Sequence, residues 1–387
     1  MSKKKILIIS PTPTHPQNAG NRIRVYNLSA ALKKLGFEVH FLFVELEEGD
    51  KDAMNCYWKD KVYYFCSKKQ LPVSPSLNIL KRFYYSFKYS SDERKYNFHI
   101  DDWYDKKLDK FIVGLQKKEQ FGTVFVEYIF LSKALLNFEE KVLKVLDTHD
   151  MFTNRYKMYL KNNQQPQWFS TYEKEETKAL NRADIIIAIQ EHEKKFFSHI
   201  SSKKIIQVGH ILSYCHSVKA TFEKKILFVA SHNPINVDGI NFFIDAVLSE
   251  LRIKYPDVKL IIAGKICRLI NGKDGIIFMG EFEDPLQVYK EADIVINPVR
   301  FGTGMNIKTI EALSYGKPLV TTSAGIAGLE YLRNKAFLVA DTNSEFIDTL
   351  SHLIDDESRR QLLIKNAENF IENYNQENLR ELGKMLN

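Results

Sequence analysis

The sequence predicts an α/β protein built from two Rossmann-like domains, and two observations carry that prediction. The apolar run KKILIIS (4–10) is followed by a loop, an amphipathic helix and a second apolar run, which is the order of a parallel βαβ unit. A similar unit begins again at KKILFVA (224–230), after which apolar runs and helical segments alternate. At 387 residues with 44% hydrophobic composition, the chain is long enough to bury two cores.

The first half is expected to form an N-terminal Rossmann-like domain over residues 1–210, called the acceptor-side domain once the resemblance described below is taken into account. Its first loop leads into an amphipathic helix over 21–36, which Gly36 is placed to end. Further strands are expected at 37–44, 123–128, 141–147, 184–190 and 205–210, with a helix over 101–118 that the letters DDW open.

The second half is expected to form a C-terminal Rossmann-like domain over 222–370, with a final helix over 371–387 that packs back towards the first domain. Its helices are expected near 239–254 and from about 343 onward, and its strands at 258–264, 275–280, 293–298 and 317–322. Ligands of open α/β sheets bind outside the carboxyl ends of the strands. Two such domains facing each other across a cleft would place both of these sheet edges around it.

The composition excludes several classes of protein. A net charge of +7 and an isoelectric point of about 8.9 are too weakly basic for a dedicated nucleic-acid-binding protein. The sequence has no run of about 18 apolar residues, as a transmembrane helix needs, and prolines interrupt the N-terminal apolar stretch, unlike a signal peptide. The four cysteines form no CxxC pair, so they suit a reduced cytosol and argue against a disulfide framework or a zinc site.

The stretch VRFGTGMNIKTIEALSYGKP (299–318) predicts a glycine-containing loop followed by a helix. The glycines allow close approach of the backbone to a ligand, and the helix start offers unpaired N–H groups to a phosphate. Lys308 adds a positive charge in the first turn, and Glu311, one turn further on, can accept hydrogen bonds from a vicinal diol such as a ribose. The alternative is an ordinary ion pair on a solvated helix face.

This half of the sequence resembles the donor domain of GT-B glycosyltransferases, especially the retaining enzymes of family 4. The motifs follow the family order over most of 225–330. They are FMGEFED (278–284), YKEADIVINP (289–298), GTGMNIKTIEALSYGKPLVTT (302–322) and SAGIAGL (323–329). The resemblance implies a GT-B fold with Lys308 as a catalytic residue and Glu311 at the donor site, together with Glu281, Gly304, Met305 and Asn306.

The N-terminal half resembles the family more loosely. The segment 11–41 is similar to the family's first loop and helix, in which a glycine, here Gly20, lets the backbone approach the donor phosphate. The segment VLDTHDMFTNR (145–155) is similar to a central strand end where a histidine often faces the reacting sugar, which makes His149 the other catalytic candidate. The alternatives are an ordinary loop glycine and a structural histidine at a strand end.

Two places depart from the family pattern. The family usually has two glutamates eight positions apart, of which the second corresponds to Glu311, while the first falls on Thr303. An arginine and a lysine that usually grip the diphosphate are missing from the loop SHNPINVDG (231–239), where His232 and Asn236 are polar stand-ins. Lys308 could supply the missing charge, so the resemblance implies nucleoside-diphosphate binding and leaves the donor sugar open.

The resemblance implies transfer of a sugar from a UDP- or GDP-sugar to a glycan or lipid-linked acceptor, with retention and with neither a metal nor another cofactor. The letters DTHD (147–150) are accordingly expected to end a strand rather than to bind a metal. Many relatives act in bacterial surface-polysaccharide or lipopolysaccharide synthesis, which suggests a cytoplasmic enzyme, peripheral at the inner face of the cytoplasmic membrane.

The segment LKRFYYSFKYSSDERKYNF (80–98) mixes basic and aromatic residues, which suits an anionic membrane surface. Inward packing of the aromatic residues explains the same pattern equally well, and a glycan acceptor site is a third explanation.

Three other functions fit the sequence less well. A dinucleotide-dependent oxidoreductase is disfavoured because the first loop has one glycine where the G-x-G-x-x-G fingerprint needs three. The other two alternatives keep the GT-B fold. One is an enzyme of another reaction, such as a sugar-nucleotide epimerase or hydrolase, and the other is a binding protein that has lost its activity.

Overall fold

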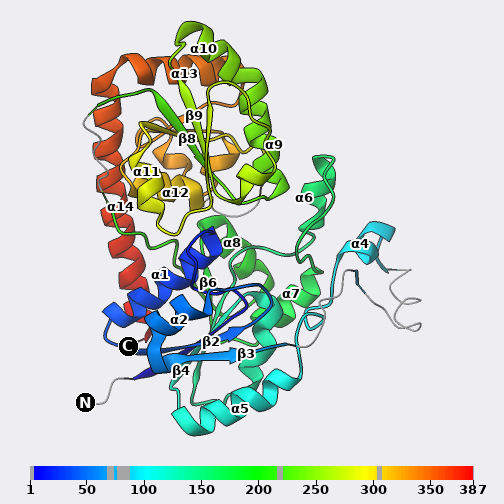
Figure 1. Ribbon diagram of the computed structural model, residues 1–387. Coiled ribbons are helices and arrows are strands. Elements are labelled where there is room, and N and C mark those ends of the chain that lie inside the picture. Colours follow the sequence, from blue (N-terminus) through cyan, green and yellow to red (C-terminus); the bar gives the residue numbers. More distant parts are fainter. Residues whose placement is uncertain (1–3, 68–73, 76–87, 216–220, 303–306, 387) are drawn as a thin grey trace. The chain divides into compact units, whose positions relative to one another are not determined.

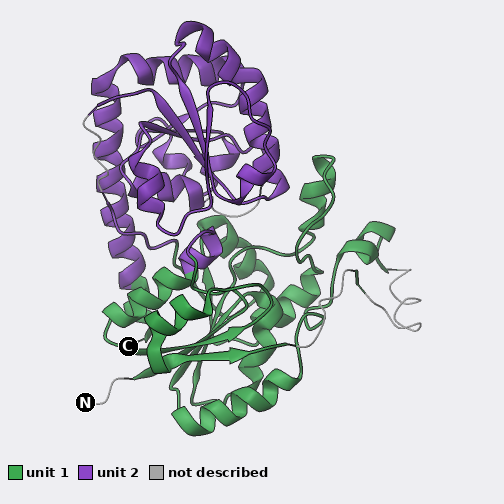
Figure 2. Ribbon diagram, viewed as in Figure 1, with its two compact units in different colours: residues 1–16, 25–209, 381–387 green, residues 17–24, 210–380 purple. Residues whose placement is uncertain are grey.

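The computed structural model describes residues 4–67, 74–75, 88–215, 221–302 and 307–386, and Figure 1 labels its elements. The chain divides into two compact units, shown in Figure 2, each with its own parallel sheet. Unit 1 comprises residues 1–16, 25–209 and 381–387, and unit 2 comprises residues 17–24 and 210–380. The predicted α/β class with two parallel sheets is confirmed.

Unit 1 contains a seven-stranded sheet in the order β3-β2-β1-β4-β5-β6-β7. The strands are β1 (Lys5–Ser10), β2 (Glu38–Val44), β3 (Val62–Phe65), β4 (Thr123–Glu127), β5 (Leu143–Asp147), β6 (Ile185–Ala188) and β7 (Lys204–Gln207). The α-helices of this half are α1 (Gly20–Lys34), α2 (Lys51–Trp58), α4 (Ser91–Tyr96), α5 (Lys107–Glu119), α6 (Tyr156–Lys161), α7 (Glu173–Leu180) and α8 (Glu191–Ile200).

The sheet of unit 1 is covered on both faces, as a parallel sheet requires. Leu7 and Ile9 of β1 belong to a core that also contains Ile112 of α5. Side chains alternate along a strand, so Ile6 and Ile8 point to the opposite face, and they too are fully buried. A continuous apolar run therefore marks this strand in the sequence.

The helix expected over 101–118 is shorter than predicted. Residues 101–103 form a turn, and α5 begins at Lys107. The Asp101 carboxylate accepts two hydrogen bonds from the Arg182 guanidinium, at 2.7 and 2.8 Å, and Asp102 accepts one from the N–H of His99 at 2.9 Å. These carboxylates hold a turn and do not cap a helix, so the prediction that DDW opens the helix is wrong.

Unit 2 contains a six-stranded sheet in the order β10-β9-β8-β11-β12-β13. The strands are β8 (Lys225–Val229), β9 (Lys259–Ala263), β10 (Ile276–Gly280), β11 (Ile294–Asn297), β12 (Leu319–Thr321) and β13 (Leu338–Val339). The helices are α9 (Pro234–Phe243), which continues through a π turn into α10 (Ser249–Lys254), then α11 (Pro285–Lys290), α12 (Ile307–Ser314), α13 (Asn343–Asp355) and α14 (Glu357–Leu386).

β10 forms one edge of this sheet and differs from the other strands in its exposure. Ile277, Phe278 and Met279 are 40, 39 and 37% exposed. Their neighbours in β9, by contrast, are buried. The apolar run that predicts this strand is therefore not matched by burial on both faces.

Helix α9 begins earlier than expected and lies very close to the loop that follows β11. The Asn233 side chain caps it by accepting a hydrogen bond of 3.0 Å from the N–H of Ile235, and a proline stands next in the first turn. A Cβ on Gly239 would lie 2.5 Å from the Pro298 carbonyl oxygen. Glycine is needed there because any side chain would push the helix away from that loop.

The basic and aromatic segment 80–98 lies partly outside the described residues, which resume at Lys88 and include α4. The contact with a membrane surface expected there stays a prediction. Within the described ranges, no helix is both long enough and apolar enough to cross a membrane.

Candidate active site

The strand order of unit 2 indicates where a ligand is expected to bind. β8 lies between β9 and β11, so the chain leaves β8 to one side and later returns to its other side. Ligands of open α/β sheets bind outside the carboxyl ends of two such strands. The chain continues from β8 into α9 and from β11 towards α12, so both helices follow strands that end at this point.

Lys308 and Asn236 join these two helices. The Lys308 Nζ donates a hydrogen bond of 2.8 Å to Oδ1 of Asn236, whose Nδ2 donates to the Ser231 carbonyl at 3.0 Å. Lys308 makes no other hydrogen bond within the part of the chain that the structure describes. An ammonium group has three N–H donors, so two of them remain for an anion.

Glu311 lies one turn further along α12 and is only 6% exposed. Its carboxylate accepts a hydrogen bond from the Tyr289 hydroxyl of α11. The Tyr289 ring stacks on Tyr315, with the ring centroids 4.3 Å apart. Lys308 and Glu311 are therefore not an ordinary ion pair on a solvated face, and that alternative is wrong.

Burial shifts the pKa values of both groups towards neutrality. Desolvation lowers the pKa of Lys308 to about 8, and the charge of Glu311 opposes this shift. Desolvation also raises the pKa of Glu311 to about 7, against the effects of Lys308 and of the Tyr289 hydrogen bond. Both charges are therefore costly in this protein without ligand, and an anion next to Lys308 would stabilise its protonated form.

Buried hydrogen bonds hold α12 against the sheet. Asn297, the last residue of β11, donates from Nδ2 to the Thr309 hydroxyl at 3.1 Å, and that hydroxyl donates to the Gly325 carbonyl at 2.6 Å. A Cβ on Gly325 would lie 2.1 Å from the Thr321 Oγ1, so only glycine fits. These contacts fix the first turn of α12 and with it the position of Lys308.

Gly20 lies close to the same helix start. It is the first residue of α1 and belongs to the segment 17–24 that is grouped with unit 2. A Cβ on Gly20 would lie 2.5 Å from Cδ1 of Ile307, the first residue of α12. This close approach gives a steric reason for glycine at this position.

The other predicted donor-site residues are less well defined. His232 is exposed in the loop before α9 and has no hydrogen-bond partner among the described residues. Glu281 follows β10 and forms an ion pair with Arg268. Thr303, Gly304, Met305 and Asn306 lie outside the described residues, so their predicted roles stay predictions.

In unit 1, His149 follows β5 and is bound to the end of the neighbouring strand. Its Nε2 lies 2.5 Å from Oε2 of Glu127, the last residue of β4, whose side chain is fully buried. A carboxylate accepts hydrogen bonds, so Nε2 carries the proton of this pair. His149 makes no other hydrogen bond within the described ranges, which leaves Nδ1 for a ligand.

The imidazole of His149 is also held by the backbone and by a ring. Tyr128 stacks on it, with centroids 3.9 Å apart and an interplanar angle of 13°. Both residues have left-handed backbone conformations, with φ of 64° for His149 and 68° for Tyr128. Such conformations are uncommon for residues other than glycine and concentrate at functional sites.

Glu127, Asp147 and His149 together bring three possible metal-ligand atoms within 4.8 Å of one another. The Nε2 of His149 in this group is the atom already bound to Glu127. The contacts of this group thus explain how the imidazole is oriented, and the expectation that the reaction needs no metal stays a prediction.

Comparison with known proteins gives the family context of these residues. Residues 223–356 match the family model described as "Glycosyl transferases group 1". This match covers Lys308, Glu311 and Asn236. The chain therefore contains a region similar to glycosyl transferases group 1, and the solved structures that it resembles share its GT-B fold.

The chain is similar to other proteins over almost its whole length. It is 23% identical to an "Uncharacterized 44.6 kDa protein in cps region" from Klebsiella pneumoniae, with 96% of each chain covered. Sucrose-phosphate synthase from Thermosynechococcus elongatus has a similar fold, with a TM-score of 0.67 at 15% identity and 99% and 98% of the two chains covered. TarM from S. aureus, in complex with Fondaparinux, alpha-GlcNAc-glycerol and UDP, gives a TM-score of 0.68 at 13% identity, with coverage of 99% and 100%.

Sequence reasoning missed two residues that support the predicted site. The sequence shows Glu127 as a carboxylate at the end of an expected strand, which could have marked it as a site residue. Its bond to His149 could not be predicted, because that bond depends on the pairing of β4 with β5. Tyr289 lies within the motif YKEADIVINP, but its hydrogen bond to Glu311 links two separate helices.

The raised pKa of Glu311 predicts how the stability of the protein depends on pH. The Glu311 carboxyl has a pKa of 4.5 in the unfolded chain and of about 7 in the folded protein, so the folded protein holds this proton more tightly. The stabilisation that protonated Glu311 gives to the folded state is therefore lost as the pH rises from 4.5 to about 7. Replacing Glu311 by glutamine is expected to remove this part of the decline, about 3 kcal/mol.

Denaturant unfolding at pH 5 and pH 8 measures this effect. Glu176, whose pKa burial also raises to about 7, is present in both proteins and cancels in the comparison. The exposed Glu281→Gln is the matched control. If the free energy of unfolding depends on pH equally in Glu311→Gln and the wild type, ionisation of Glu311 does not destabilise the folded protein.

Proposed function

We propose that this protein is a glycosyltransferase that moves a sugar from a nucleoside-diphosphate sugar to a glycan or lipid-linked acceptor, with retention and without a metal. The observation that carries the proposal is the half-buried Lys308, whose two remaining N–H donors lie at the start of α12, next to Asn236. This is the place in unit 2 where an open sheet binds ligands. Lys308 compensates for the arginine and lysine that the loop 231–239 lacks.

The reaction follows from the charge of the leaving group. When the bond between the anomeric carbon and the diphosphate breaks, negative charge collects on the diphosphate oxygens. Lys308 and the N–H groups at the start of α12 would stabilise that charge where it develops. Glu311 would accept hydrogen bonds from the ribose, and His149, oriented by Glu127, would contact the reacting sugar through Nδ1.

The relatives support the class of substrates. One solved neighbour binds UDP together with saccharides, and the curated relative is named for a cps region. We therefore propose bacterial surface-polysaccharide synthesis as the setting and a capsule-type glycan as the acceptor.

A thermal-shift experiment tests the donor site directly. UDP or GDP at millimolar concentration is expected to raise the melting temperature by several degrees, since a ligand that binds only the folded state stabilises it. The matching nucleoside monophosphate, which lacks the second phosphate, is expected to give a clearly smaller shift. No shift with either diphosphate would contradict the proposed site.

A screen of sugar nucleotides then identifies the donor. Release of UDP or GDP with the sugar transferred supports the transferase, whereas an epimerised sugar nucleotide would support the alternative reaction.

A further inference from the structure

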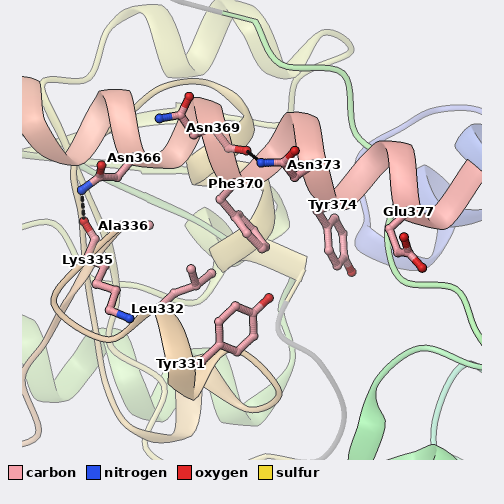
Figure 3. Close-up of a pocket in the computed structure, with 10 residues that line it drawn as sticks. All are labelled: Tyr331, Leu332, Lys335, Ala336, Asn366, Asn369, Phe370, Asn373, Tyr374 and Glu377. Carbon is pink, nitrogen blue, oxygen red and sulfur yellow. Dashed lines mark hydrogen bonds between the residues drawn. The ribbon is translucent and has the colours of Figure 1, made fainter.

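A pocket whose lining does not include Lys308 lies in unit 2, between α14 and the segment that precedes β13. Its volume is about 570 Å³, within the range of small-molecule sites. Figure 3 shows its lining, which consists of Tyr331, Leu332, Lys335, Ala336, Asn366, Asn369, Phe370, Asn373, Tyr374 and Glu377. Neither the donor site nor His149 uses any of these residues.

Three aromatic rings form the apolar part of this pocket. Figure 3 shows the Phe370 and Tyr374 rings extending from α14 on the side of the helix where Tyr331 lies. The Phe370 centroid is 5.2 Å from that of Tyr374 and 6.4 Å from that of Tyr331. Tyr331 is 61% exposed, so its ring is available to a ligand.

Hydrogen bonds hold the elements that carry the rings in place. The Tyr374 hydroxyl accepts a hydrogen bond of 3.1 Å from the N–H of His210, and this bond restrains the Tyr374 ring. The Asn366 Nδ2 donates to the Lys335 carbonyl at 2.8 Å and ties α14 to the segment that carries Tyr331. The aromatic surface is thus preorganised, which lowers the entropic cost of binding.

Polar groups at the rim of the pocket are available for hydrogen bonds to a ligand. Neither the Tyr331 hydroxyl nor the Lys335 ammonium has a hydrogen-bond partner among the residues that the structure describes. The Asn366 and Asn373 amide groups each use their nitrogen in a bond to a backbone carbonyl, and their oxygens stay free to accept. The pocket therefore offers both donors and acceptors around apolar rings.

Among the lining residues Lys335 is the one cation and Glu377 the one anion, and Glu377 is already paired with Arg380. A nucleoside diphosphate would need more positive charge. A sugar ring has an apolar face of C–H groups, which fits the negative face of an aromatic ring, and a rim of hydroxyl groups, which pair with amides and hydroxyls.

We propose that this pocket binds neutral sugar units of a glycan, as a second carbohydrate site apart from the donor site. The inference deepens the proposed function and rests on it, because the glycan acceptor is the natural source of such sugars. A growing polysaccharide held here would stay on the enzyme between transfers.

Binding without catalysis tests this inference separately from the proposed function. The full chain, without donor, is mixed with a panel of neutral tetrasaccharides made of glucose, galactose and N-acetylglucosamine, and saturation-transfer NMR detects contact with the protein. At least one tetrasaccharide is expected to bind, and Tyr331→Ala is expected to weaken its binding by about tenfold because it removes a stacking ring. Tyr331→Phe, which keeps the ring, is expected to stay close to the wild type.

Leu362→Ala is the matched control, since Leu362 is a 47% exposed residue of α14 that does not line the pocket. It is expected to bind the tetrasaccharide like the wild type. No binding by any panel member, or equal binding by Tyr331→Ala and the wild type, would overturn the inference. A UDP-induced thermal shift that persists in Tyr331→Ala would show that the donor site is unaffected, so the two proposals can fail independently.

Discussion

Replacing Lys308 by methionine is expected to lower kcat/KM for sugar transfer by about 10²–10³-fold, the usual cost of removing one group that stabilises charge in the transition state. The same substitution is expected to abolish most of the UDP-induced thermal shift, because Lys308 supplies the two free N–H donors at the start of α12. Steady-state kinetics and thermal unfolding measure the two effects on one preparation.

The melting temperature of Lys308→Met distinguishes loss of the site from loss of the folded structure. The pKa of Lys308 is lowered to about 8 by burial, so its charge costs free energy in the protein without ligand. We therefore expect Lys308→Met to unfold at the same temperature as the wild type or higher while losing activity. The exposed Lys290→Met is the control and is expected to retain activity. A Lys308→Met enzyme with normal kinetics would exclude Lys308 from the reaction.

Replacing His149 by asparagine is expected to reduce kcat by about 10²-fold, because the oriented imidazole would no longer position the reacting sugar. Asparagine tolerates the left-handed backbone that His149 adopts, so the local fold is expected to survive. Glu127→Gln is expected to have a smaller effect on kcat and to change the pH dependence of kcat, because Glu127 acts by orienting the imidazole.

The exposed His192→Asn in unit 1 is the matched control and is expected to behave like the wild type. If His149→Asn retains full kcat, the histidine is a structural residue at a strand end. An unchanged pH profile in Glu127→Gln would exclude the orienting role and leave Glu127 as a buried packing residue.

Much of the fold could be predicted because parallel strands buried on both faces form continuous apolar runs. β1, β2, β4 and β8 are such strands, and each was predicted within a few residues of its bounds. β3 and β13 were not predicted. Both lie at sheet edges, and their residues are only partly buried, so their sequences carry a weaker apolar signal.

The site could be predicted only where its residues are local in sequence. Lys308 and Glu311 lie on one short helix, so their spacing alone brings them together. The bonds from Lys308 to Asn236 and from His149 to Glu127 join residues 72 and 22 positions apart, and they exist because neighbouring strands end at the same edge. A single sequence contains no direct record of such pairings.

The exposed strand β10 has a consequence for how this enzyme behaves in solution. An edge strand presents unpaired backbone groups to any other chain, and apolar side chains beside them favour intermolecular pairing. β10 combines both properties through Ile277, Phe278 and Met279, and no charged residue interrupts it. Aggregation of concentrated protein would therefore begin by strand addition at β10, even while each molecule remains fully folded.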